Sequence, residues 1–219
     1  MKRVYLMSEG QTEETFVRKL LYPHLLDRGI CSVPILFRTS RDARDGIVSY
    51  GKVRTQILRK CREDPAATVT TLIDLYGLPR DFPGWVPPGR GTPYDRTQQL
   101  EDAFGADIGE NNFLPHLTVH KFEALLFSQV EAFATWCDHP NLVDTLAGIN
   151  RAFESPEHIN DGPETAPSKR ILYAVGDEKC QNPLHSPLIA MDIGLDHIRK
   201  QCLHFAQWLT RIETLASDD

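Results

Sequence analysis

The sequence predicts an α/β fold in which a mostly parallel central sheet is flanked by helices and followed by a helical C-terminal part. Three β-prone runs, at residues 3–7, 30–37 and 67–75, are separated by segments with helical periodicity. This alternation is typical of a parallel sheet with right-handed crossovers. The 219 residues suffice for one substantial core, so we expect a single domain spanning 1–219.

Two helices are predicted between these three strands. Apolar residues at helical spacing from Phe16 to Leu25 indicate the first helix, with Thr12 as its N-cap and Gly29 after its end. Apolar residues on one face indicate the second, over about 50–62. The third strand ends in an acid, because it reads Ala-Thr-Val-Thr-Thr-Leu-Ile-Asp-Leu.

The second half of the chain is less regular. Residues 77–94 contain five prolines and four glycines, which predict a long loop. The elements expected after this loop are a helix over about 95–104, a short strand over 113–119, a helix opening at His120, an irregular insertion over 138–168 around a helix near 143–152, and helical periodicity from Leu195 to Leu215.

The composition excludes some classes of protein. No apolar run approaches the ~20 residues of a membrane-spanning helix, and Glu9 interrupts the short apolar start, so we expect a cytoplasmic protein. The net charge of −6 argues against a protein that coats nucleic acid through overall positive charge. The five cysteines form no Cys-x-x-Cys pair, so reduced thiols are expected rather than a zinc site or a disulfide framework.

One segment, from residue 38 to residue 62, is distinctly basic. It fits a phosphate-contacting surface and a solvated helix face about equally well. Its basic residues are Arg38, Arg41, Arg44, Lys52, Arg54, Arg59, Lys60 and Arg62.

Two carboxylates follow predicted strand ends, Glu9 and Asp74. Ligands of an open parallel sheet bind beyond the carboxyl ends of its strands, so these acids should converge on one crevice. Their mutual repulsion would be relieved by a hard cation such as Mg²⁺. Glu13, four residues after Glu9, is either a further ligand or a helix N-terminal acid favoured by the macrodipole. Asp74 alternatively caps the loop that follows it.

Several blocks of the sequence carry a family resemblance. Residues 8–13, Ser-Glu-Gly-Gln-Thr-Glu, resemble the Glu-Gly-x-x-Glu signature of Toprim domains in overcoming-lysogenization-defect nucleases. The blocks at 74–79, 81–84, 122–128 and 167–170 resemble the bacterial Toprim-like family called domain of unknown function 4276. The resemblance implies a Toprim-like (Rossmann-like) fold and a metal-dependent nuclease that works alongside an ATPase partner in phage defence.

The resemblance also implies a set of metal ligands. In the wider Toprim group, Mg²⁺ is bound by a glutamate after the first strand and by an Asp-x-Asp pair after a later one, but here Tyr76 replaces the second acid of that pair. Glu123 is the expected substitute, because a helix start after the strand at 113–119 would bring it to the crevice. Alternatively, Glu123 is an acid on the solvent-exposed surface of that helix. His120 either lies near Glu123 or serves as a cap or packing residue.

Two basic residues and two aromatic residues are candidates for substrate contacts. Lys169 and Arg170 follow Pro-Ser in an otherwise acidic region, where they could contact a scissile phosphate. Alternatively, they lie in the solvated first turn of a helix. Trp85 and Tyr94, in the Pro/Gly-rich loop, either stack on bases or anchor the loop to the core.

Together these patterns predict a Mg²⁺- or Mn²⁺-dependent phosphodiesterase acting on nucleic acid, with DNA favoured over RNA. An ATPase partner would supply recognition or control, which fits an acidic chain that borrows its affinity for DNA. The alternatives are a non-catalytic interaction subunit whose Asp-x-Tyr motif no longer binds metal, nucleotidyl transfer on the same fold, and an enzyme of small phosphate compounds. The assigned residues are Glu9, Asp74 and Lys169 as catalytic, Glu9, Glu13, Asp74 and Glu123 as metal ligands, and Lys169 and Arg170 as phosphate contacts.

Overall fold

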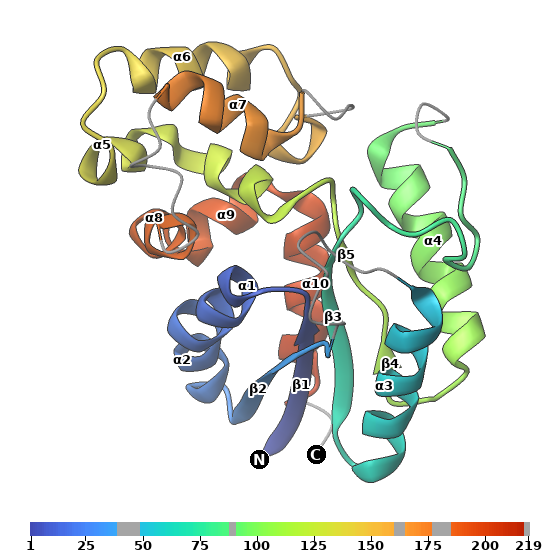
Figure 1. Cartoon of the computed structure of the whole chain (residues 1–219). Coiled ribbons are helices and arrows are strands. Elements are labelled where there is room, and N and C mark those ends of the chain that lie inside the picture. The colour runs from blue at the N-terminus through green and yellow to red at the C-terminus, as the bar shows by residue number, and fades with distance from the viewer. Residues whose placement is uncertain (39–48, 88–90, 160–164, 177–184, 217–219) are drawn as a thin grey trace.

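The computed structural model describes residues 1–38, 49–87, 91–159, 165–176 and 185–216, and its centre is a parallel sheet (Figure 1). Four strands lie in the order β2-β1-β3-β4, and β5 pairs with β3 beyond the end of β4. The predicted α/β fold with a parallel sheet is therefore confirmed. The strands are β1 (Lys2–Ser8), β2 (Ile30–Leu36), β3 (Thr68–Asp74), β4 (Phe113–Leu114) and β5 (Leu117–Thr118).

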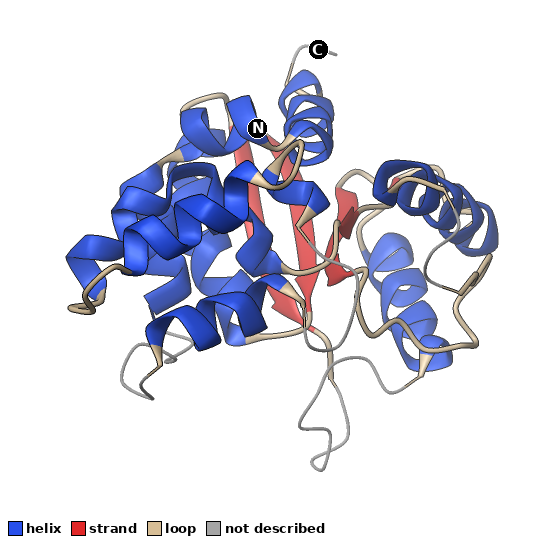
Figure 2. Cartoon of the chain, turned by 90° about the horizontal axis from the view of Figure 1, so that it is seen from above, coloured by secondary structure: helices blue, strands red, loops and turns tan. Residues whose placement is uncertain are grey.

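Helices cover both faces of the sheet, and Figure 2 shows the strands running between two helical layers. One layer contains α3 and α4, and the other contains α1, α2 and the C-terminal helices. The helical elements are α1 (Gln11–Phe16), the π-helical η1 (Val17–Leu21), α2 (Tyr22–Leu26), α3 (Tyr50–Glu63), α4 (Pro93–Ile108), the 3₁₀-helical η2 (Phe122–Ala132), α5 (Phe133–Trp136), α6 (Leu142–Arg151), the 3₁₀-helical η3 (Pro156–His158), α7 (Pro167–Val175), α8 (His185–Ile193), α9 (Leu195–Gln201) and α10 (Leu203–Thr214).

The two layers enclose two hydrophobic cores on opposite faces of the sheet. In β3, Leu72 faces the core of α1, α2 and α10, whereas Val69 and Ile73 face the core of α3 and α4. In β1, Leu6 faces the first of these cores and Met7 faces the second. The division follows from the two-residue period of a strand and explains why strands buried on both faces read as continuous apolar runs.

Three predicted elements differ in detail from the structure. The strand expected over 113–119 is divided at Pro115 into β4 and β5, because proline has no N–H for the ladder. The C-terminal helix is interrupted at Cys202, which has extended backbone angles and separates α9 from α10. The helix expected to open at His120 begins instead at Phe122, because His120 has a φ of 64°, which a helix does not accommodate. This helix is 3₁₀-helical.

Other helix boundaries, and the number of helices, also differ from the prediction. The first helix is capped by Gly10 rather than Thr12. The helix after the Pro/Gly-rich loop starts at Pro93 and runs to Ile108. The insertion over 138–168 contains α6 as expected, and in addition η3. Helix α7 corresponds to the helix start given as the alternative for Lys169 and Arg170, whereas α8 lies where no helix is predicted. Both helices pack against η2.

The cysteines are not all reduced. Cys31, Cys61 and Cys202 are free thiols, as expected. The expectation is wrong for Cys137, which is disulfide-bonded. None of the helices in the described part of the chain has both the length and the apolar character needed to cross a lipid bilayer.

Candidate functional site

The sheet has a topological switch point between β1 and β3. From β1 the chain crosses to β2 on one side, and the next strand, β3, lies on the other side of β1. Such a point leaves a crevice beyond the carboxyl ends of the two strands, where open α/β sheets bind their ligands. Glu9 directly follows β1 and Asp74 ends β3, so the strand order places both acids at this crevice.

Glu9 and Asp74 are joined by a hydrogen bond. The backbone N–H of Asp74 donates to Glu9 Oε1 over 3.0 Å. The side chain of Asp74 is held as well, because its Oδ1 accepts the N–H of Phe122 over 3.0 Å. Asp74 therefore holds the start of η2 against the end of β3, which places Glu123, the next residue of η2, at the same crevice.

Glu13 combines the two roles left open for it. Its Oε2 accepts the N–H of Gly10 over 3.1 Å in the first turn of α1, so it is an acid that caps a helix. It also belongs to the acidic group, because burial and then the charge of Glu123 raise its pKa. Glu9, Glu13, Asp74 and Glu123 are together called the acidic cluster below.

Three carboxylates of the acidic cluster have raised pKa values. Burial, followed by the charges of Glu9, Glu13 and Glu123, raises the pKa of Asp74 well above its usual value. Burial also raises the pKa of Glu123. The ammonium group of Lys121 acts against all three shifts. Carboxylates that are buried close to one another favour either bound protons or a bound cation.

Tyr76 occupies the position of the missing second acid. Its ring lies under the ammonium of Lys121, with Nζ 5.3 Å from the ring centroid, and its N–H donates to the carbonyl of His120 over 2.9 Å. The side chain of His120 belongs to another environment, because burial and then the charges of Arg96 and His158 lower its pKa to about 4. Glu123, not His120, is therefore the residue that the structure adds to the two strand-end acids.

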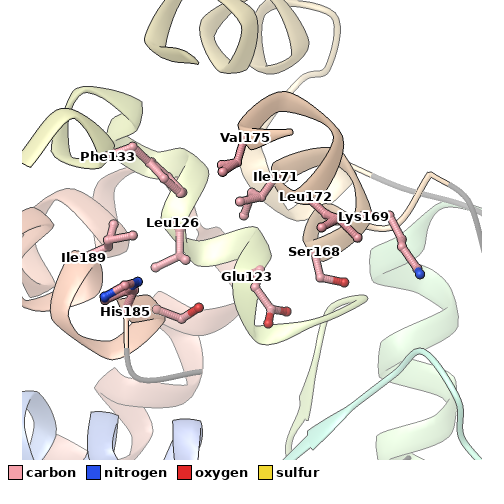
Figure 3. Close-up of a pocket in the computed structure, with 11 residues that line it drawn as sticks. Glu123, Leu126, Phe133, Ser168, Lys169, Ile171, Leu172, Val175, His185 and Ile189 are labelled. Carbon is pink, nitrogen blue, oxygen red and sulfur yellow. The ribbon is translucent and has the colours of Figure 1, made fainter. Parts of the chain in front are cut away.

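A pocket of about 260 Å³ adjoins the acidic cluster between η2, α7 and α8 (Figure 3). Glu123 lines it from η2, and Ser168 and Lys169 line it from the first turn of α7. Figure 3 shows the Lys169 side chain at the edge of the pocket, with its nitrogen directed outward, away from Glu123. The apolar lining residues are Leu126, Phe133, Ile171, Leu172, Val175 and Ile189.

Arg170 is directed away from this pocket. Its Nε donates to the carbonyl of Thr165 over 2.7 Å, and its guanidinium lies 5.1 Å from the centroid of the Phe153 ring. It lines a separate hollow with Ile149 and Tyr173. Consecutive helical residues point about 100° apart, which explains why Lys169 and Arg170 do not share a face.

The two loop aromatic residues have packing roles. The hydroxyl of Tyr94 donates to Glu157 Oε2 over 2.9 Å, and its ring makes an edge contact with His158. Trp85 packs against the core of α3 and α4, with Arg80 6.0 Å from its ring. These contacts correspond to the anchoring alternative rather than to base stacking.

The described part of the basic segment is a helix face with ion pairs. Arg41 and Arg44 lie outside the described residues. Four of the others are paired with acids on α3 or nearby, which favours the solvated-face alternative over a phosphate-binding surface. The pairs are Arg54 with Asp107, Arg59 and Lys60 with Glu63, and Arg62 with Glu110.

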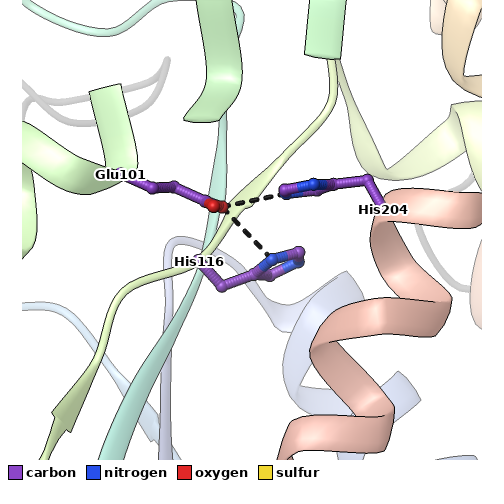
Figure 4. Close-up of side chains that lie close together, drawn as sticks. All are labelled: Glu101, His116 and His204. Atoms are coloured by element: carbon purple, nitrogen blue, oxygen red, sulfur yellow. Dashed lines mark hydrogen bonds and ion pairs between the residues drawn. The ribbon is translucent and has the colours of Figure 1, made fainter. Parts of the chain in front are cut away.

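A second group of titratable residues was not found from the sequence. Glu101, His116 and His204 come from three separate segments and meet in the interior (Figure 4). Burial alone would raise the pKa of Glu101, but hydrogen bonds with the two histidines outweigh burial and lower the pKa to about 2. No spacing motif connects these residues, so the sequence alone contained no pattern that would have identified them.

The fold and the acidic cluster define an α/β protein with four carboxylates at the switch point of a parallel sheet. Residues 8–213 match the family model described as Domain of unknown function (DUF4276), and the chain belongs to this family. No curated protein and no solved structure matches the chain.

Proposed function

We propose that this protein is a Mg²⁺- or Mn²⁺-dependent phosphodiesterase that cleaves nucleic acid at the acidic cluster. The observation that carries the proposal is the convergence of Glu9, Asp74 and Glu123 at the β1/β3 switch point. This is the position where an open parallel sheet binds ligands, and carboxylates there suit a metal that activates phosphate esters.

The chemistry of the acidic cluster fits a hard divalent cation. The cluster offers oxygen atoms, which Mg²⁺ and Mn²⁺ prefer. Burial raises the pKa of Asp74 and of Glu123, and the neighbouring acids raise that of Asp74 further, so a bound cation would be favourable there. Glu9, Asp74 and Glu123 would hold the ion, with Glu13 as a further ligand. The bound ion would polarise a phosphoryl oxygen of the substrate.

The rest of the site would position the phosphate. Lys169 stands at the rim of the pocket that Glu123 lines, where its ammonium would pair with the negative charge that develops on the phosphoryl group. The hydrogen bonds of Asp74 to Glu9 and to Phe122 would keep the acids in place. We leave Arg170 out of the proposed site, because its guanidinium is engaged on the other face of α7.

The wider biological setting is proposed from the resemblance of residues 8–13 to the Toprim signature. That resemblance supports a Toprim-like relationship, an ATPase partner and a role in phage defence. The net charge of −6 supports a subunit whose affinity for DNA is supplied in part by a partner. DNA is the proposed substrate in preference to RNA.

Metal titration followed by cleavage assays tests this function. Calorimetric titration with Mn²⁺ and Mg²⁺ compares the wild type with Glu9→Gln and Asp74→Asn, which both keep the oxygen that accepts a backbone N–H. Glu131→Gln, at an exposed acid on η2, is the matched control. Binding by the wild type and the control but not by the two variants, together with metal-dependent cleavage of labelled DNA, supports the proposal.

A non-catalytic interaction subunit is the second candidate, and one observation favours it. Among the described residues, no three of these four acids have oxygens that all lie within 4.8 Å of one another, and Glu9 and Glu13 each accept a backbone hydrogen bond. The carboxylates could therefore serve the fold alone. A folded wild type that binds neither ion, even with an oligonucleotide present, would establish this alternative.

A further inference from the structure

Glu101, His116 and His204 bring three ligand atoms to one point in the interior. Glu101 Oε1 lies 2.9 Å from His204 Nε2 and 3.4 Å from His116 Nδ1, and the three atoms all lie within 4.8 Å of one another (Figure 4). The residues come from α4, from the link between β4 and β5, and from the first turn of α10. Their exposed fractions are 4%, 2% and 8%.

The surrounding side chains hold this geometry in place. The ring of His116 stacks with that of Trp208, 4.4 Å away, and with that of His204, 5.1 Å away. Trp208 is itself fixed by a hydrogen bond from Nε1 to Thr70 Oγ1 of 2.9 Å. Glu101 Oε1 also accepts the N–H of Leu117 over 2.7 Å. Contacts of this kind orient metal ligands in proteins and restrict their rotamers.

The backbone at His204 is also held by a second buried carboxylate. Glu157 accepts the N–H of His204 at Oε2 over 2.9 Å and the N–H of Phe205 at Oε1 over 3.0 Å. Glu101 and Glu157 therefore place two carboxylates around His204. This negative surrounding favours a cation at the point where the three ligand atoms meet.

We propose that Glu101, His116 and His204 form a second metal site, which takes a transition metal ion of the Zn²⁺ class. Two imidazole nitrogens and one carboxylate suit Zn²⁺ and neighbouring transition metals, whereas the acidic cluster offers oxygen alone and suits Mg²⁺. The site therefore differs from the proposed nuclease centre both in place and in preferred ion, and it does not depend on that proposal.

The two separations that involve Glu101 Oε1 are close to those of tetrahedral coordination, and the His116 and His204 rings, which lie 17° from parallel, would tilt so that both nitrogens face the ion. Ligand distances of about 2.0–2.1 Å place ligand atoms about 3.3 Å from one another. The 3.4 Å between Glu101 Oε1 and His116 Nδ1 already meets this value, and the 2.9 Å to His204 Nε2 would widen by a few tenths of an ångström. On binding the ion, a neutral imidazole would carry its proton on the ring nitrogen that does not face the metal, and only a protonated imidazole would release a proton to solvent.

The fourth coordination position has space beside it. Glu101, His116 and His204 line a pocket of about 600 Å³, whose polar walls include Gln98 and Arg211. Three protein ligands and an open position are the pattern of metal sites that bind water or a small anionic ligand, not of closed structural sites. The geometry thus points to an accessible ion.

The test uses the full-length protein after treatment with a chelator. Equilibrium dialysis against Zn²⁺ with elemental analysis should give about one bound ion per chain in the wild type. Glu101→Gln and His204→Gln should weaken binding by at least about 10-fold, since even changes outside the ligand shell cost 10–100-fold. His197→Gln, at an exposed histidine of α9, is the matched control and should bind as the wild type does. Asp74→Asn should also keep Zn²⁺, which separates this site from the acidic cluster.

X-ray absorption spectroscopy of the zinc-loaded wild type tests the ligands without relying on variants that fold. Two imidazoles with oxygen ligands are expected. Sulfur ligands would indicate binding at cysteines, and oxygen alone would indicate the acidic cluster, so either result would overturn the proposal. A folded wild type that takes up no more Zn²⁺ than Glu101→Gln would show that the three residues form only a hydrogen-bonded group.

Discussion

The N–H of Asp74 donates to Glu9 Oε1 over 3.0 Å, which ties the last residue of β3 to the first residue after β1. The bond brings two carboxylates together in a half-buried crevice, where burial and then the charge of Glu9 raise the pKa of Asp74. A protein keeps such an arrangement at a cost to its stability, and the cost falls when a proton or a metal ion is bound.

The pH dependence of stability should reveal this cost. The folded-state pKa of Asp74 is raised above its unfolded value of about 3.9, so the contribution of Asp74 to stability is fully present below that value and is lost as pH rises through the raised pKa. Asp74→Asn cannot lose a proton and should melt at a higher temperature than the metal-free wild type at pH 8. The difference should be smaller at pH 5, and each kcal/mol corresponds to about 2–4 °C.

Bound Mn²⁺ should reverse this order, so that the wild type melts at a higher temperature than Asp74→Asn. At a Mn²⁺ concentration 100 times its dissociation constant, the wild type would gain about 2.7 kcal/mol, and Asp74→Asn much less. Calorimetric melting with and without Mn²⁺ measures both quantities. Equal shifts in the two proteins would mean that Asp74 is not a metal ligand.

Lys169 and Arg170 should differ sharply in function. Lys169→Ala should reduce cleavage by about 100-fold with little change in Mn²⁺ affinity, because it removes a group that stabilises phosphate charge. Arg170→Ala should leave the cleavage rate within a few-fold and lower stability by about 1 kcal/mol, because it loses the hydrogen bond to Thr165. Steady-state cleavage rates and denaturant unfolding distinguish the two. Equal losses of activity would place both residues at the substrate.

Tyr76→Asp should strengthen metal binding. The substitution restores the second acid of the Asp-x-Asp pair at the strand end and removes the ring that lies under Lys121. We expect a higher Mn²⁺ affinity and a less stable metal-free protein, because a fifth acid adds to the repulsion. Titration calorimetry and thermal melting measure the two effects. Tyr76→Phe is the matched control, since it keeps the ring. An unchanged Mn²⁺ affinity would show that position 76 does not face the ion.

Trp208→Phe should loosen the Glu101, His116 and His204 group. The variant loses the hydrogen bond from Nε1 to Thr70, which leaves a buried hydroxyl without its donor and costs about 1–3 kcal/mol. Zn²⁺ affinity should fall with it, because His116 stacks on the Trp208 ring. Denaturant unfolding and dialysis measure the two losses. A stability loss with unchanged Zn²⁺ affinity would show that the stacking does not position His116.

Much of the core architecture could be predicted from local patterns. Three β-prone runs became β1, β2 and β3. The two central strands, β1 and β3, have buried residues on both faces, and the edge strand β2 follows the same β-branched pattern. Glu9 and Asp74 could be assigned to one crevice as well, because the end of a strand is recognisable from neighbouring residues and parallel strands end at the same edge of the sheet. The helix α8 is not predicted and α7 only as an alternative, because such short helices depend on packing, here against η2, rather than on their own propensity.

The sequence by itself determined the parallel sheet, the acids at its strand ends and the family blocks around them. Only the tertiary structure decided which side chains meet. In the folded chain, Lys169 and Arg170 lie on different faces of α7, and the side chain of His120 lies near Arg96 and His158. His204 contacts Glu101, although 103 positions separate them in the sequence. The physical reason is that periodicity and strand ends are encoded by neighbouring residues, whereas a contact between distant segments depends on how whole helices pack.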